Sequence, residues 1–253
     1  MIVFAPLRTR RLAVRLQELP IGDEMALCAV PGTLHEKALS EFLAYCVETA
    51  ETPSDKYIAD PRAWSVAERL LVLAHYQSHT REDAPDYAVT ETSRLSDYLD
   101  MSRDIGAAPT FTTADDEWTL QPLTGAMAEA IETLQLETGE GANGHEHWLF
   151  GTMAAQLVRK GESQPDAIAE PAGYIEWLRL RMTIMRKLPS SDARELYDCY
   201  CRAQEDATQF FRVWFDNQGI IALPKEAGAP IPPARFLVYS CVSELARSLS
   251  GKP

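Results

Sequence analysis

The feature that most constrains the fold is a segment of strict helical period at residues 34–49. Its apolar residues recur at three- and four-residue steps, and Thr33 with Glu36 forms the T-x-x-E pattern of a capping box. A second box, Ser65 with Glu68, opens another segment of helical period. The sequence therefore predicts helices at 34–49 and 65–79. The apolar face of the first comprises Leu34, Ala38, Leu39, Phe42, Leu43, Cys46 and Val47.

Strand patterns lie at both ends of the chain. Leu12, Val14 and Leu16 alternate with other residues, which predicts a strand at 11–19 that pairs with residues 2–7 across a polar turn. Two apolar runs around Asp216–Gly219 predict a hairpin at about 211–223. The fold class expected is α+β, predominantly helical, with small antiparallel β elements near the N-terminus and at about 211–223. The other expected elements are helices at 23–28, 95–101, 124–136, 147–160, 172–187, 192–209 and 234–249, a strand at 118–120, and loops through the rest of 81–117.

Charge divides the chain into three segments. The net charge is −13, but residues 1–81 and 141–253 are close to neutral, so nearly all of the excess lies at 82–140. We describe the three as an N-terminal segment of strands and amphipathic helices, an acidic loop-rich segment, and a helical C-terminal segment with a hairpin. An acidic chain is a poor match for phosphate groups, which excludes nucleic acid as the main partner. The acidic segment is either a solvated insertion or a surface that attracts a basic protein partner.

The compartment expected is the cytoplasm. No apolar run approaches the about 18 residues that a membrane span needs, and no charged region precedes the apolar residues at the start of the chain. The five cysteines are an odd number without a C-x-x-C pair, which indicates reduced thiols, mostly buried, rather than a disulfide framework.

Catalytic signatures are scarce. The sequence contains no G-x-S-x-G motif, and no serine or cysteine lies in an activating context. His75 and His79 are four residues apart on a predicted helix, the spacing that zinc sites use. Glutamate does not directly follow His75, however, and histidines near a helix end often form hydrogen bonds there. We therefore expect no catalytic residue, no cofactor and no bound metal, with His75 and His79 as the candidate ligands should a metal bind.

Three groups of segments together carry a resemblance to a known family. The first is the strand and turn at 12–27 followed by the helix at 34–49. The second is Trp64–Arg69 leading to Ala74–Thr80. The third combines Leu188–Asp192, Phe215–Ile220 and Pro232–Phe236. Taken together, these segments resemble tail-assembly chaperones and baseplate-hub assembly proteins of tailed bacteriophages.

The resemblance implies a non-enzymatic phage tail or baseplate protein, either a structural hub subunit or an assembly chaperone. Such a protein works by contact with other tail or baseplate proteins, in the host cytoplasm during assembly or in the virion tail. The contact residues expected are Leu34, Leu39, Phe42, Leu43, Trp214 and Phe215. Two alternatives stay open: a metal-dependent enzyme that uses His75 and His79, and a bacterial adaptor module without a phage role.

Overall fold

The computed structural model describes residues 2–50, 59–104, 107–113, 116–138 and 144–251. The helices are α1 (Ile21–Ala29), α2 (His35–Cys46), η1 (Pro61–Ala63), α3 (Val66–Thr80), η2 (Leu95–Asp97), α4 (Gly125–Thr138), α5 (Gly144–Gln156), α6 (Pro171–Met185), α7 (Ser190–Asp206), η3 (Val238–Cys241) and α8 (Glu244–Leu249). The strands are β1 (Leu7–Arg8), β2 (Ala13–Leu16), β3 (Val47–Ala50), β4 (Ala88–Thr90), β5 (Ser93–Arg94), β6 (Thr110–Thr113), β7 (Asp116–Leu120), β8 (Leu157–Arg159), β9 (Arg212–Asp216) and β10 (Gly219–Leu223). The α+β class with small antiparallel sheets is confirmed.

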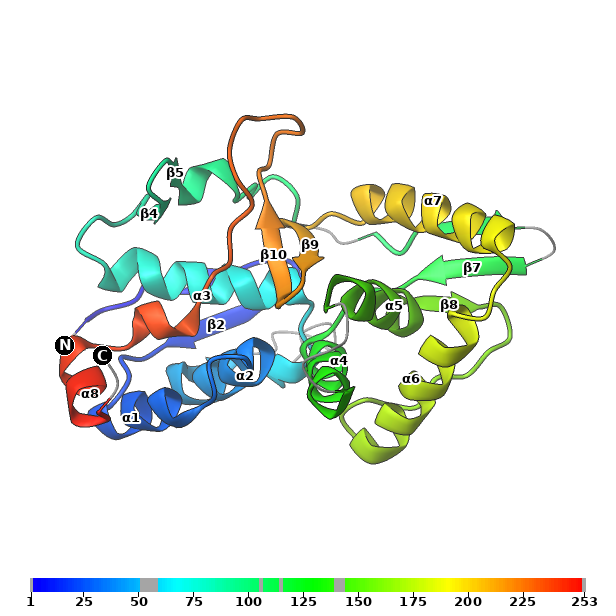
Figure 1. The fold of residues 1–253 in the computed structure, drawn as a ribbon. Helices are drawn as coiled ribbons and strands as arrows, with labels where there is room; N and C mark the ends of the chain where they lie inside the picture. The colour runs from blue at the N-terminus through cyan, green and yellow to red at the C-terminus, as the bar shows by residue number, and fades with distance from the viewer. Residues whose placement is uncertain (1, 51–58, 105–106, 114–115, 139–143, 252–253) are drawn as a thin grey trace.

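The N-terminal elements form one side of the molecule. β2 pairs antiparallel with β1 on one edge and with β3 on the other, in the order β1-β2-β3. The predicted pairing of residues 2–7 with the strand at 11–19 is confirmed only at its end, where Leu7 lies opposite Val14 and Arg8 opposite Ala13, while residues 2–6 form no strand. Helices α1, α2 and α3 lie on the same side of the molecule as this sheet (Figure 1).

The other side is built from the middle of the chain. β7 lies between β6 and β8 in a second three-stranded sheet, and α5, α6 and α7 lie around it (Figure 1). Helix α4 joins the two sides because it contacts α2 and α3 as well as α5 and α6. The β9-β10 hairpin lies between the two sides, and its turn uses Gly219 at a φ of 122°. The chain then returns, so that α8 packs on α1 and both termini lie at the same end (Figure 1).

Helix α4 changes the interpretation of the acidic segment at 82–140. Ile131 and Leu134 are buried in the common core, and Glu132 is buried beside α2. The C-terminal part of the acidic segment is therefore not a solvated insertion. The remaining residues form short elements, β4 to β7 and η2, joined by loops.

Several element boundaries differ from the sequence prediction. The helix predicted at 147–160 ends at Gln156, because Leu157–Arg159 pairs with β7 as strand β8. Of the helix predicted at 95–101, only the 3-10 helix Leu95–Asp97 forms. The helix predicted at 34–49 ends at Cys46, because the β-branched residues that follow pair with β2 as strand β3. Residues 110–113 form strand β6 rather than a loop, paired with β7 from Thr110 to Thr113. The helix predicted at 234–249 forms only in its last part, as η3 and then α8, which begins after the cap Ser243.

One of the two capping boxes is confirmed. The Ser65 hydroxyl accepts from the Glu68 amide at 3.1 Å, and the Glu68 carboxylate accepts from the Ser65 amide at 2.8 Å. At α2 the prediction is wrong, because the N-cap residue is Leu34, whose own side chain forms no hydrogen bond to the helix. Glu36 turns inward to a buried arginine instead. The five cysteines are free, and Cys28, Cys46 and Cys241 are buried. No helix among the described residues is long and apolar enough to cross a membrane.

Candidate interaction surfaces

The histidines of α3 hold the N-terminal segment. His75 Nε2 donates to the Ala5 carbonyl oxygen at 2.7 Å, and His79 Nε2 accepts from the Ala5 amide at 3.3 Å. His79 Nδ1 donates to the His75 carbonyl oxygen at 2.8 Å, and Phe4 stacks on Tyr76 with ring centroids 5.0 Å apart. In the part of the chain that the structure describes, no group of three or more His, Cys, Asp or Glu side chains could hold a metal ion. Both rings therefore have a structural task in fastening residues 2–6 to α3.

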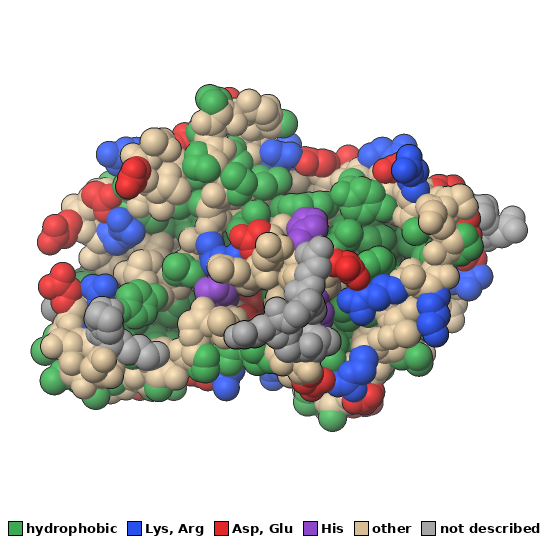
Figure 2. Space-filling model, in the orientation of Figure 1, with side chains coloured by type: hydrophobic (Ala, Val, Ile, Leu, Met, Phe, Trp, Pro, Cys, Tyr) green, Lys and Arg blue, Asp and Glu red, His purple; other side chains and the backbone are tan. Residues whose placement is uncertain are grey.

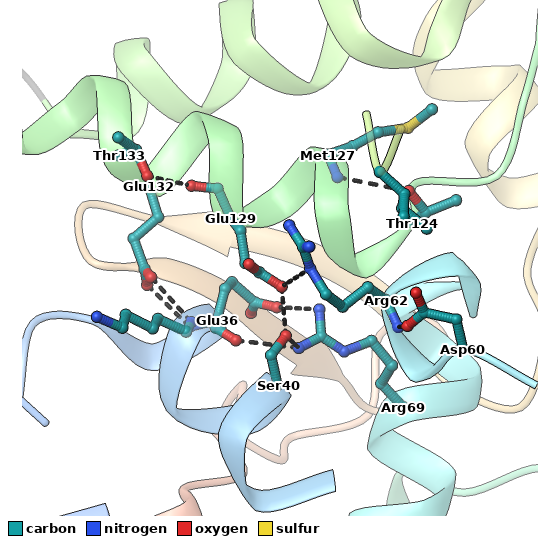
Figure 3. A network of polar contacts seen from close by, with 12 residues as sticks. Glu36, Ser40, Asp60, Arg62, Arg69, Thr124, Met127, Glu129, Glu132 and Thr133 are labelled. Carbon is teal, nitrogen blue, oxygen red and sulfur yellow. Dashed lines mark hydrogen bonds and ion pairs between the residues drawn. The ribbon is translucent and has the colours of Figure 1, made fainter. Parts of the chain in front are cut away.

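A buried network of charged side chains joins α2, α3 and α4 (Figure 3). Arg69 is fully buried on α3, and its guanidinium donates to the Glu36 carboxylate at 3.3 Å, the Glu36 carbonyl at 3.0 Å and Ser40 Oγ at 2.7 Å. Ser40 in turn donates to Glu129, whose carboxylate pairs with Arg62 Nε at 3.3 Å. Burial raises the pKa of Glu36, whereas the charge of Arg69 lowers it. These groups bind one another, so the network fixes the angle between helices.

Glu132 caps α2 from a different helix. Its two carboxylate oxygens accept from the amides of Glu36 at 2.8 Å and Lys37 at 3.0 Å, which are free donors in the first turn of α2. Figure 3 shows the side chain reaching across from α4. Burial raises the pKa of Glu132 to about 7, against the lowering effect of the Glu36 amide.

A small cavity with a mostly apolar lining and one polar wall lies between α3, α7 and the hairpin. Its volume is about 70 Å³, and Trp214 and Phe215 line it. On its polar wall the Tyr200 hydroxyl donates to Gln156 Oε1 at 3.0 Å, and Gln204 Nε2 donates to the same oxygen at 2.6 Å. Pockets for organic ligands usually measure about 300 Å³ or more. The cavity therefore has room for a few water molecules and not for an organic substrate.

The first large apolar surface is a groove of about 400 Å³, which we call the α1–α2 groove. Its walls are the end of α1, the start of α2 and the segment 236–242, and none of its lining residues is a Lys, Arg, Asp or Glu. Leu237 and Tyr239 on its wall are 40% and 39% exposed. The lining residues are Leu27, Cys28, Val30, Pro31, Gly32, Leu34, His35, Ala38, Phe236, Leu237, Val238, Tyr239 and Val242.

A second groove of about 530 Å³ lies between α5 and the start of α7, and we call it the α5–α7 groove. Figure 2 shows hydrophobic side chains gathered over these two helices, to the right of centre. Phe150 and Met153 line it from α5, and Tyr197 lines it from α7. Unlike the first groove it includes charged residues, Arg194 and Asp198.

The structure separates the predicted contact residues. Leu39, Phe42 and Leu43 are buried in the protein's own core, because the apolar face of α2 packs on its own neighbours, so they offer no surface to a partner. Phe215 is also buried, and Trp214 is half-buried and stacks on it with centroids 4.7 Å apart. Only Leu34 lies in a groove.

The other wall of the α1–α2 groove was not predicted from the sequence. Residues 236–242 lie some 200 positions away from α1 and α2 in the chain, and no periodic pattern links the two stretches. The sequence signals at this segment, the helix predicted at 234–249 and the resemblance at Pro232–Phe236, do not indicate a contact surface.

Comparison with known proteins identifies no relative of this chain. No protein-family model, no curated protein and no solved structure matches this chain.

Proposed function

We propose that the protein is a non-enzymatic component of bacteriophage tail or baseplate assembly that acts by binding other tail proteins. The observation that carries the binding role is the α1–α2 groove, whose lining includes no Lys, Arg, Asp or Glu. Exposed apolar surfaces that are framed by polar residues are typical of protein contact sites. The assignment to phage tails rests on the sequence resemblance at residues 12–27 with 34–49, at 64–69 with 74–80, and at 188–192, 215–220 and 232–236.

The groove indicates what kind of partner segment fits. A cavity of about 400 Å³ accepts a few apolar side chains, such as those on one face of a helix. Acidic residues lie on the helices beside it, Asp23 and Glu24 in the first turn of α1 and Glu244 at the start of α8. The net charge of −13 lies almost wholly at residues 82–140, so that segment would attract a basic partner, while the groove itself fits a segment that is apolar on one face.

The acidic segment contributes long-range attraction in this proposal. Glu82 and Glu91 are exposed at its N-terminal end, where a basic partner would meet them. Because α4 is part of the core, deleting residues 82–140 would unfold the protein and test nothing. Neutralising Glu82 and Glu91 to glutamine keeps the core and should slow association with a basic partner, mostly at low salt.

The test is complementation of tail assembly in the phage or lysogen that carries the gene. Leu34→Asp and Leu237→Asp each place a charge in the α1–α2 groove, at positions that are half-buried or exposed, so the fold should survive. The matched control is Met101→Asp, at a residue 51% exposed and outside the groove. We expect the two groove variants to lose tail assembly and the control to retain it. Normal assembly with both groove variants, each shown to be folded by its melting curve, would contradict the proposal.

A further inference from the structure

Helix α6 has an unusual surface, because apolar side chains lie on its outer face as well as on its inner one. Its inner face packs on α4 and α5, with Leu178, Met182 and Met185 buried. On the outside, Leu180 is 62% exposed and Ile184 is 55% exposed, one turn apart. A helix that is apolar on both faces is normally covered on both. Figure 1 shows α6 at the edge of the molecule, where another protein can reach it.

The outer face continues onto a neighbouring helix. Leu136 on α4 is 53% exposed, and α4 packs along α6. The ion pairs of Arg179 with Glu137 and with Glu176 run across this surface. The apolar side chains thus lie within a frame of charged residues, as at the rim of a protein interface.

The outer face of α6 carries an exposed acidic residue toward one end and an exposed basic residue just beyond the other. Glu176, Leu180 and Thr183 lie along one line of α6, and Lys187 follows four residues later in the turn after the helix ends at Met185. Lys187 continues the helical turn, since its amide donates to the Ile184 carbonyl at 3.0 Å. Glu176 and Lys187 lie at equal distances on either side of the midpoint of this line, about 16 Å apart along the axis.

We propose that this face binds a second copy of the same chain, with the two α6 helices antiparallel about a two-fold axis that passes between Leu180 and Thr183. In that arrangement Glu176 of each copy lies opposite Lys187 of the other, and Leu180 lies opposite Thr183 with Ile184 beside it. One surface is then complementary to itself, as an isologous dimer interface requires. A partner of a single charge sign would meet a like charge at one end of the line, so the mixed charge pattern favours a second copy.

This inference does not depend on the proposed role in tail assembly. The α1–α2 groove and α6 use different residues, so either can fail while the other stands. The interface described by α6 and Leu136 is small, and the dimer should therefore be weak and concentration-dependent.

The experiment is sedimentation equilibrium of the full chain between about 10 and about 300 µM. We expect the average mass to rise from the monomer value of 28.2 kDa toward that of a dimer. Leu180→Glu should weaken the dimer about tenfold or more, because it places a charge near the centre of the interface. The matched control is Leu245→Glu on α8, at a leucine 60% exposed, which should leave the dimer unchanged.

Charge exchange makes the test specific to the antiparallel arrangement. Glu176→Lys and Lys187→Glu should each weaken the dimer, because like charges then face each other twice per interface. The double variant should restore it. A chain that stays at 28.2 kDa over the whole range, a dimer indifferent to Leu180→Glu, or a double variant no tighter than either single variant would overturn the proposal.

Discussion

Replacing Glu132 by glutamine tests how burial and helix capping compete at one carboxylate. Glutamine has the same shape but carries no charge, so it resembles the protonated form of Glu132. In the folded protein the carboxylate is buried and accepts from the amides of Glu36 and Lys37. The two bonds and the positive end of α2 favour the charged form, whereas burial favours the neutral one.

The magnitude follows from the pKa. Burial raises the pKa of Glu132 from 4.5 to about 7, so the folded protein holds a proton there that the unfolded chain has released. The contribution of this group to stability is therefore fully present below the unfolded pKa and is lost as the pH rises through the folded one. Between about pH 5 and about pH 8 the wild type should lose about 2 to 3 kcal/mol from this group. The glutamine variant loses none of it.

The assay is urea unfolding of wild type and Glu132→Gln across this pH range. The other titrating groups are common to both proteins and cancel in the difference, except for groups such as Glu36, whose charge interacts with that of Glu132. We expect near-equal stability at about pH 5 and a variant that is more stable by about 2 to 3 kcal/mol at about pH 8. A difference that does not change with pH, or one that favours the wild type at high pH, would show that capping of α2 outweighs burial.

Three further predictions concern three histidines and two glycines. Burial lowers the pKa of His35, His75 and His147, so the unfolded chain takes up protons that the folded protein does not as the pH falls below about 6.5. The urea midpoint of the Glu132→Gln variant should therefore fall as the pH falls below about 6.5. A midpoint that stays constant would be incompatible with this reasoning. Gly125→Ala should lower the free energy of unfolding, measured by calorimetry, by about 2 to 3 kcal/mol, because the new Cβ would overlap the buried Arg69 guanidinium. A variant as stable as the wild type would refute the packing described here. Gly22→Ala, in α1 with no atom within 4 Å of the new Cβ, should instead stabilise the protein by about 0.5 to 1 kcal/mol, and a loss of stability would count against this view of α1.

The sequence predicted the elements whose signals are local. The Ser65–Glu68 box and the hairpin turn at Gly219 depend on residues within a few positions of each other, and both are confirmed. The Thr33–Glu36 box failed because Glu36 binds Arg69, 33 residues away, and Glu132 replaces it as the cap. Strand β3 was missed because its pairing with β2 is a tertiary contact that helical periodicity does not register.

The candidate surfaces were only partly predictable, for the same reason. Apolar residues on α2 were expected to meet a partner, but most meet the protein's own core, and only Leu34 lines the α1–α2 groove. Which apolar residues stay exposed depends on where distant segments pack, as the contribution of 236–242 to this groove shows. The charge pattern at 82–140 is visible in the sequence, yet its helix α4 turned out to hold the two sides of the fold together.

The most direct test of the assembly role is quantitative mass spectrometry of purified phage or induced-prophage particles. The measurement compares the copy number of this protein with those of the tail components, in the wild type and in a strain that lacks the gene. We expect a fixed, low copy number per particle for a structural subunit, or absence from particles together with failure of tail assembly in the deletion strain for a chaperone. Absence from particles combined with normal tails in the deletion strain would contradict the account.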